Sequence, residues 1–95
     1  MAFYVYMLLC ADGSFYTGHT DHLENRIADH KFGRFGGYTT KRRPVRLMWS
    51  QDFPTRYEAL TAEQQVKGWS RAKKQALIAG DWVLLSLLAR NRQGH

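Results

Sequence analysis

Two short apolar and aromatic stretches, separated by a polar turn, open the chain. Phe3–Cys10 is rich in tyrosine, valine and leucine, which favours a β-strand. Asp12 and Gly13 follow soon after it, and an Asp-Gly pair is a strong hairpin signal. Ser14–Gly18 is therefore the expected return strand, and the first two strands are predicted to be antiparallel.

The next segments predict a helix and a third strand. Asp21, with Glu24 three residues later, has the spacing of a capping box, so we expect a helix over Leu23–His30 or slightly beyond. A loop rich in glycine follows this helix. Val45–Ser50 alternates enough to form a third strand, and Pro44 can stand at its start, where a missing N–H does little harm.

Further helices complete the predicted order. Thr55 with Glu58 repeats the capping signal ahead of a helix over Tyr57–Lys67. Two more helices are expected. The first is capped by Ser70, runs through Ile78 and is ended by Gly80. The second is short, is capped by Asp81 and covers Trp82–Ala89. Strands followed by helices in this order predict an α+β protein.

Length and cysteine content limit the architecture. The 95 residues form one expected domain, 1–95, with its core at about 3–82 and a C-terminal helix and tail at 82–95. Cys10 is the single cysteine, which excludes an internal disulfide and a zinc site with paired cysteines; we expect it to be buried. The sequence has neither a signal-peptide pattern nor a bilayer-length apolar stretch, so we expect a cytoplasmic protein without membrane contact.

Net charge points to a polyanionic partner. Lysines and arginines number 14 against 8 acidic residues, a formal charge of +6. Such a field favours nucleic acid, or less readily an anionic membrane. Basic residues are interleaved with Tyr38 and Trp69, a mixture that suits phosphate contacts and base stacking. An ordinary solvated face, or a surface for an acidic protein, would give the same composition.

Helical spacing draws attention to Arg26 and His30. They stand four residues apart, along one edge of the apolar stripe that Leu23 and Ile27 define. A guanidinium and an imidazole are thus expected together at the rim of the core. The alternative is structural: an edge arginine that reaches water and a histidine that caps a helix or packs in the core.

Glu63 is placed where a carboxylate is costly. It falls inside the apolar face that Ala59, Ala62 and Val66 form on the predicted second helix. A carboxylate turned toward a core needs a partner or a cation. Two interpretations stay open: a buried salt bridge to an arginine, or a ligand for a hard cation such as Mg²⁺, which proteins often hold with one or two carboxylates.

Tyrosines on the first two strands are the third candidate group. Tyr4 and Tyr6 share parity and point to one face, and Tyr16 lies on the paired strand. They are either ordinary strand residues whose hydroxyl groups reach the solvent, or phenols that lie near a phosphate. In the second case a nearby cation and Arg26 could lower the pKa of a phenol enough to make it a base.

These residues together resemble the GIY-YIG nuclease superfamily. Its two strand motifs correspond to YVY, ending at Tyr6, and YTG, starting at Tyr16, followed by Arg26, His30 and Glu63 on helices. The stretches GGYTTKRRPV, FPTRYEAL and AEQQVKGWSRAKKQALIAGDW resemble the small single-domain members. Two positions depart from the family pattern, since tyrosine replaces the first glycine and threonine replaces the aliphatic residue of the second motif.

The resemblance implies a small three-stranded antiparallel sheet flanked by helices, and metal-dependent hydrolysis of phosphodiester bonds. It implies the following roles: Tyr6 orients the site, Tyr16 activates water, Arg26 stabilises charge on phosphate, His30 accepts a proton or contacts phosphate, and Glu63 holds one Mg²⁺ or Mn²⁺. Whether Tyr16 or His30 is the base stays open, as does the role of His19.

We therefore expect a DNA endonuclease with little sequence specificity, acting on single-stranded, duplex or branched DNA. The alternative is a nucleic-acid-binding module without catalysis. The residues expected to contact nucleic acid are Lys41, Arg42, Arg43, Lys67, Arg71 and Lys73.

Overall fold

A three-stranded sheet with helices on both faces organises the protein. The computed structural model describes residues 2–93, and side chains up to residue 88. The elements are β1 (Phe3–Leu9), β2 (Phe15–Thr20), α1 (Leu23–Lys31), the short 3₁₀ helix η1 (Thr40–Arg42), β3 (Arg46–Phe53), α2 (Arg56–Lys67), α3 (Arg71–Ala79) and α4 (Trp82–Gln93). The predicted α+β class and the order of elements are confirmed.

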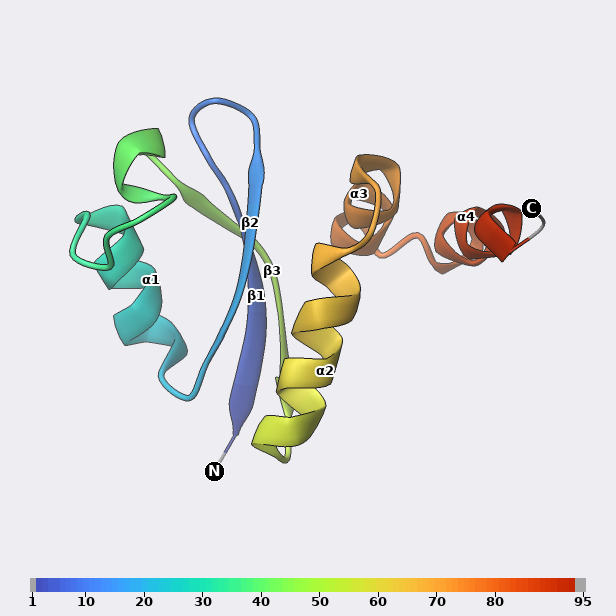
Figure 1. Cartoon of the computed structure of the whole chain (residues 1–95), viewed down its shortest axis with the longest axis horizontal. Helices are drawn as coiled ribbons and strands as arrows, with labels where there is room; N and C mark the ends of the chain where they lie inside the picture. The colour runs from blue at the N-terminus through green and yellow to red at the C-terminus, as the bar shows by residue number, and fades with distance from the viewer. Residues whose placement is uncertain (1, 94–95) are drawn as a thin grey trace.

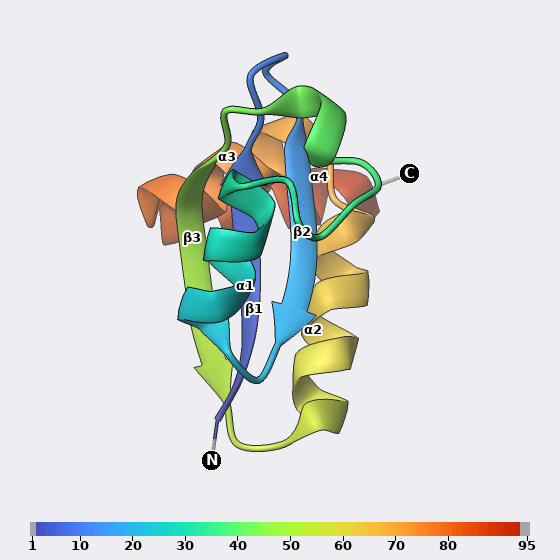
Figure 2. The same cartoon turned by 90° about the vertical axis from the view of Figure 1, so that its left-hand side faces the viewer.

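The sheet has the strand order β2-β1-β3, and both pairings are antiparallel. Helix α1 covers one face, while α2 lies on the other, and α3 and α4 extend beyond α2 (Figures 1 and 2). Strand β1 is central and buried, so its alternate residues serve the two faces. Strand β2 is an edge strand, which leaves one of its sides open to the solvent.

Two hydrophobic clusters fill the space on either side of β1. On the α1 face, Tyr6, Leu8 and Cys10 pack with Ile27 and Val45. On the other face, the cluster consists of Met7, Val66 and Leu77, with partly buried aromatic and aliphatic residues around it. The expected burial of Cys10 is confirmed, since the residue is 3% exposed. Its thiol is free.

Strands β2 and β3 extend further than their composition suggested. The register pairs Tyr4 with Thr20 and Phe3 with Phe53, so β1 is hydrogen-bonded along its whole length on both sides. Ser50, Gln51 and Asp52 of β3 are polar and exposed, which an outer strand tolerates, and the half-buried Phe53 ends the strand. Because the sequence after Ser50 is polar, its pattern predicts a strand that ends at Ser50, earlier than the observed end at Phe53.

Three of the four predicted helix N-caps are confirmed, and one is wrong. Thr55 and Ser70 accept hydrogen bonds from the backbone N–H groups three residues later, as expected. Asp81 likewise accepts from the backbone of the last helix. The capping box at Asp21 is wrong: the N-cap residue is His22, without a side-chain cap, because the chain stays extended in β2 through Thr20.

The C-terminal helix also differs from the prediction. It continues to Gln93, whereas the sequence placed its end near Ala89. Its Trp82, Val83 and Leu87 are largely exposed, and it packs on α3 rather than on the sheet. Within residues 2–93, no helix combines the length and the apolarity that a bilayer span requires.

Gly18 is a packing requirement of the sheet. It lies on β2 directly opposite Tyr6, whose ring leans across the strand. A Cβ atom at this position would lie 2.6 Å from the Tyr6 hydroxyl oxygen and 2.7 Å from Cζ, well inside van der Waals contact. The glycine of the second motif thus makes room for the tyrosine of the first.

This packing predicts the effect of a single methyl group. We expect Gly18→Ala to lower the free energy of unfolding by about 1–3 kcal/mol, because Tyr6 must move within a close-packed core. Gly68→Ala is the matched control, since the nearest atom to its new Cβ is 3.6 Å away. Urea unfolding of both variants measures the difference. Equal stabilities for the two variants would contradict the packing role of Gly18.

Candidate active site

Five predicted site residues come from four elements that meet around the open edge of the sheet. Tyr6 lies on β1, Tyr16 on β2, Arg26 and His30 on α1, and Glu63 on α2. The first four are on the α1 face, while Glu63 approaches from the α2 side. Tyr16, Arg26 and Glu63 can approach the same edge of the sheet because β2 is the edge strand and α2 runs beside it (Figure 2), whereas Tyr6 and His30 are fully buried behind them.

A buried chain of hydrogen bonds connects β1, α1 and the following loop. The Tyr6 hydroxyl lies 2.8 Å from His30 Nε2, and His30 Nδ1 lies 2.6 Å from the Thr39 hydroxyl. All three side chains are buried. Because both imidazole nitrogens are engaged, His30 fixes the Tyr6 phenol and cannot turn toward a phosphate without breaking this chain.

Burial also sets the charge of His30. The cost of desolvation, followed by the Arg26 guanidinium, lowers its pKa to about 4, and Asp29 opposes this shift. The imidazole is therefore neutral near neutral pH. A neutral ring has one donor and one acceptor nitrogen, which suits a position between two hydroxyl groups.

Tyr16 differs from Tyr6 in having an available hydroxyl. Its ring centroid lies 6.3 Å from that of Tyr6 and 5.1 Å from that of His30, and Tyr38 stacks against it at 6.1 Å. Within the described residues, no protein group hydrogen-bonds to the Tyr16 hydroxyl. The side chain lines a hollow of about 350 Å³ together with Phe15, Thr17, Tyr38, Lys67 and Lys74.

Both phenols hold their protons more tightly than free tyrosine. Burial is the main cause that raises the pKa of Tyr6, the neighbouring Tyr16 phenol adds to it, and the Arg26 guanidinium opposes it. Burial likewise raises the pKa of Tyr16, against the opposing effects of Lys67 and Arg26. For Tyr16, Lys67 and Arg26 act in the direction that lowers the pKa, but desolvation outweighs them; the lowering expected from a bound cation together with Arg26 stays a prediction.

Arg26 is placed between the two tyrosines and the loop that follows α1. Its guanidinium carbon lies 4.6 Å from the centre of the Phe35 ring, a cation–π arrangement that limits where the side chain can point. The side chain is half-buried. Its positive charge lowers the pKa of Tyr6, of Tyr16 and of His30. Arg26 is therefore the charge that all three side chains share.

Glu63 is buried, as its position on the apolar face predicted, with Ala59 and Val66 buried one turn to either side. Its two oxygens have different partners: Oε1 lies 2.8 Å from His19 Nδ1, and Oε2 lies 3.1 Å from Lys67 Nζ. The carboxylate thus has ion-pair partners, though neither is an arginine. His19, whose role the sequence left open, shares the α2 face because it alternates with Gly18 on β2.

The donor set around Glu63 fits a single cation with open positions. No group of three or more His, Cys, Asp or Glu side chains gathers within the described part of the chain. Glu63 would therefore be the only carboxylate ligand, with water and substrate oxygens completing the shell, a mode common for Mg²⁺. Lys67 is 54% exposed at its side chain, so its ammonium can leave Oε2 readily.

The six residues expected to contact nucleic acid have different surroundings. Lys41, Arg43 and Arg71 are exposed, and Lys67 pairs with Glu63. Arg42 binds Asp12 at 3.0 Å and lies 3.7 Å from the centre of the Tyr38 ring. Lys73 is buried, with its ammonium 4.3 Å from the Trp69 ring. Contact between these residues and nucleic acid stays a prediction.

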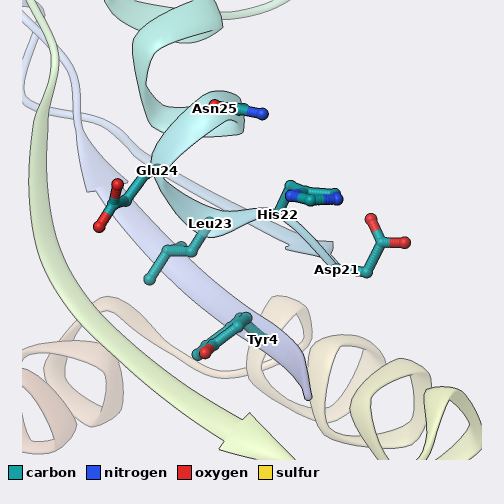
Figure 3. A pocket seen from close by; sticks show the side chains of 6 residues that line it. All are labelled: Tyr4, Asp21, His22, Leu23, Glu24 and Asn25. Carbon is teal, nitrogen blue, oxygen red and sulfur yellow. The ribbon is translucent and has the colours of Figure 1, made fainter. Parts of the chain in front are cut away.

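A second hollow, of about 320 Å³, lies at the start of α1. It is lined by Tyr4, Asp21, His22, Leu23, Glu24 and Asn25. Figure 3 shows the carboxylates of Asp21 and Glu24 pointing away from each other, so they do not form a shared cation site. Tyr4, although it has the parity of Tyr6, belongs to this hollow and not to the cluster around Tyr16.

Comparisons with known proteins agree with this geometry. The family model described as the GIY-YIG catalytic domain matches residues 2–76. A UPF0213 protein of Lacticaseibacillus paracasei is 45% identical over 76 residues, covering 80% of this chain and 85% of its own. A UPF0213 protein of Natronomonas pharaonis is 42% identical over 78 residues, covering 82% and 92%.

Two solved structures are also similar. The solution structure of a UPF0213 protein from Bacillus halodurans has a TM-score of 0.55 at 44% identity, covering 83% of this chain and 84% of that one. A solution structure from E. faecalis has a TM-score of 0.60 at 39% identity, covering 87% and 88%. With the family match extending over all five site residues, the chain belongs to the GIY-YIG family.

Proposed function

We propose that this protein is an endonuclease that hydrolyses phosphodiester bonds of DNA, using one Mg²⁺ or Mn²⁺ ion. The observation that carries the proposal is the convergence at the β2 edge of an available phenol, a guanidinium and a buried carboxylate. Tyr16 supplies the phenol and lines a solvent-connected hollow, and Arg26 and Glu63 lie close enough for their charges to act on that phenol. Membership of the GIY-YIG family supports the same chemistry.

Each group has a distinct task in this proposal. Arg26 would bind a non-bridging phosphate oxygen and stabilise the charge that develops as water attacks phosphorus. Glu63 would hold the divalent cation with one carboxylate oxygen. When bound there, that cation supplies positive charge to the phosphate and to the leaving oxygen.

Tyr16 would position the attacking water. Its pKa is raised, so the phenol keeps its proton in the protein alone and first acts as a hydrogen-bond partner. Added positive charge beside it would favour the phenolate, which could then accept the proton of the water. Tyr6 and His30 would keep the neighbouring walls of the site in place through their buried hydrogen bond.

The main alternative is a nucleic-acid-binding module without turnover. The formal charge of +6 serves either activity, because it favours phosphate contacts of any sequence. Binding alone gives no reason to bury a carboxylate beside these basic groups, since that carboxylate would repel a phosphate. Glu63 therefore favours the enzyme over the binding module.

Removal of single groups from the site tests the assigned tasks. We expect Tyr16→Phe and Arg26→Ala each to lower the rate of DNA cleavage by about 10²-fold or more, as loss of one transition-state contact commonly does. Tyr57→Phe and Arg56→Ala are matched controls at exposed positions of α2 and should cleave at the parent rate. Parent-like cleavage by both site variants would contradict the proposed mechanism.

Glu63→Gln separates catalysis from structure. The amide keeps the shape and can still accept a hydrogen bond from His19, whereas the charge that attracts a cation is lost. We expect cleavage to be abolished, with a melting temperature equal to or above that of the parent, because a costly buried charge is neutralised while the Lys67 side chain, 54% exposed, returns to water. Glu24→Gln, at an exposed position of α1, is the control. Retained cleavage together with a large loss of stability would mean that Glu63 is purely structural.

The neutral state of His30 predicts a pH dependence of stability. Its pKa is lowered from 6.5 to about 4 on folding, so the unfolded chain binds more protons between these values. The stabilising contribution is complete above about pH 6.5 and is lost as the pH falls toward 4. It amounts to at most about 3 kcal/mol.

Urea unfolding between pH 7 and pH 4 measures this contribution. We expect His30→Gln to be less stable at pH 7 but to lose less stability on acidification than the parent does. His22→Gln, which alters an exposed histidine, should keep the parent slope. Parallel profiles for the parent and His30→Gln would show that His30 does not titrate as described.

A further inference from the structure

His19 lies directly against the carboxylate that the proposed function assigns to the cation. The distance from His19 Nδ1 to Glu63 Oε1 is 2.8 Å. The His19 side chain is 29% exposed, against 8% for Glu63, so the imidazole is the more accessible of the two groups. Its backbone belongs to β2, one residue beyond the glycine that accommodates Tyr6.

We propose that His19 is a second protein ligand of the cation, bound through Nδ1. The site would then present one carboxylate oxygen and one imidazole nitrogen, and it would prefer Mn²⁺ or another first-row transition ion to Mg²⁺. The inference rests on the proposed function only in that Glu63 takes up the divalent ion.

The distance between the two atoms suits neighbouring ligands. Metal–nitrogen and metal–oxygen bonds of about 2.1 Å at right angles place two ligand atoms about 3 Å apart. The observed 2.8 Å is close to this separation, so the two atoms already lie at a spacing that one ion can bridge once the imidazole turns its Nδ1 toward it. A neutral imidazole can hold its single proton on Nε2, which leaves Nδ1 as the donor atom for a metal.

Charge also favours a nitrogen ligand here. Within the described residues no cluster of three or more acidic, histidine or cysteine side chains adds to Glu63, and Lys67 offsets part of its charge at Oε2. A single carboxylate, with water and substrate oxygens completing the shell, is sufficient for Mg²⁺, which gains nothing from a nitrogen ligand because it prefers oxygen. Imidazole suits transition ions, and affinity for such mixed sites rises along the series from Mn²⁺ to Cu²⁺. His19 would therefore strengthen binding of these ions without adding negative charge near the phosphate.

A positioning role for His19 makes a different prediction. If the imidazole only orients Glu63 through a hydrogen bond, its loss weakens Mn²⁺ and Mg²⁺ binding by similar factors. Replacement by glutamine would then restore binding, because the amide can donate the same hydrogen bond to Oε1. A ligand role predicts a selective loss of Mn²⁺ affinity that glutamine does not restore.

The test measures Mn²⁺ affinity by electron paramagnetic resonance, and Mg²⁺ affinity by competition, without substrate. We expect the parent to prefer Mn²⁺ by at least about tenfold, and His19→Ala and His19→Gln each to lose at least about tenfold in Mn²⁺ affinity. Their Mg²⁺ affinity should change by less than about threefold. His22→Ala is the control, since His22 is an exposed histidine in the other hollow. Pulsed resonance of bound Mn²⁺ should show coupling to a ¹⁴N nucleus in the parent that is missing in both His19 variants.

Two results would overturn the inference: Mn²⁺ bound at Glu63 without nitrogen coupling that depends on His19, or equal losses for the two metals. Circular dichroism of the variants shows whether they are folded. Failure of the proposed function is recognised separately, because Glu63→Gln would then leave Mn²⁺ affinity unchanged, or the parent would bind Mn²⁺ and yet cleave no DNA.

Discussion

The buried hydrogen bond between Tyr6 and His30 is the interaction on which the rest of the site depends. It joins the central strand to α1 at 2.8 Å, inside a region closed to solvent. The same tyrosine ring occupies the space above Gly18. Because α1 is fixed in this way, Arg26 lies next to both tyrosines, and Tyr16 packs against the His30 ring with its hydroxyl still available.

The open edge of the sheet is the second constraint. Side chains on opposite faces of a sheet are normally separated by the backbone. Here β2 has no outer neighbour, so Glu63 on α2 lies close enough to raise the pKa of the Tyr16 phenol across that edge. A phosphate that approaches the edge could therefore meet the phenol, the guanidinium and the carboxylate together. The edge position of β2 is the feature that turns a small sheet into a candidate active site.

Local patterns predicted much of this arrangement, for physical reasons. An Asp-Gly pair needs only its neighbours to form a hairpin, and the four-residue spacing of Arg26 and His30 follows from the helical repeat. Glu63 could be singled out because a carboxylate on an apolar helix face costs free energy unless a partner or a cation compensates for its burial. None of these inferences required knowledge of how distant elements pack.

Features that depend on packing were beyond local patterns. The contact between His19 and Glu63 joins residues 44 positions apart, and it requires α2 to lie beside β2. Lys73 looks like any surface lysine in the sequence but is covered in the structure. Desolvation raises the pKa of Tyr16 in the protein alone and outweighs the lowering effects of Lys67 and Arg26. In each case the decisive quantity is burial, which the tertiary fold sets.

The most direct test of the account is cleavage by the parent protein. End-labelled single-stranded, duplex and branched DNA would be incubated with the protein in Mn²⁺, in Mg²⁺ or in excess chelator, and the products separated by size. The account predicts internal cleavage of at least one substrate with a divalent ion and none with chelator. Salt-sensitive DNA binding with no cleavage under any metal condition would contradict it and leave a binding module in its place.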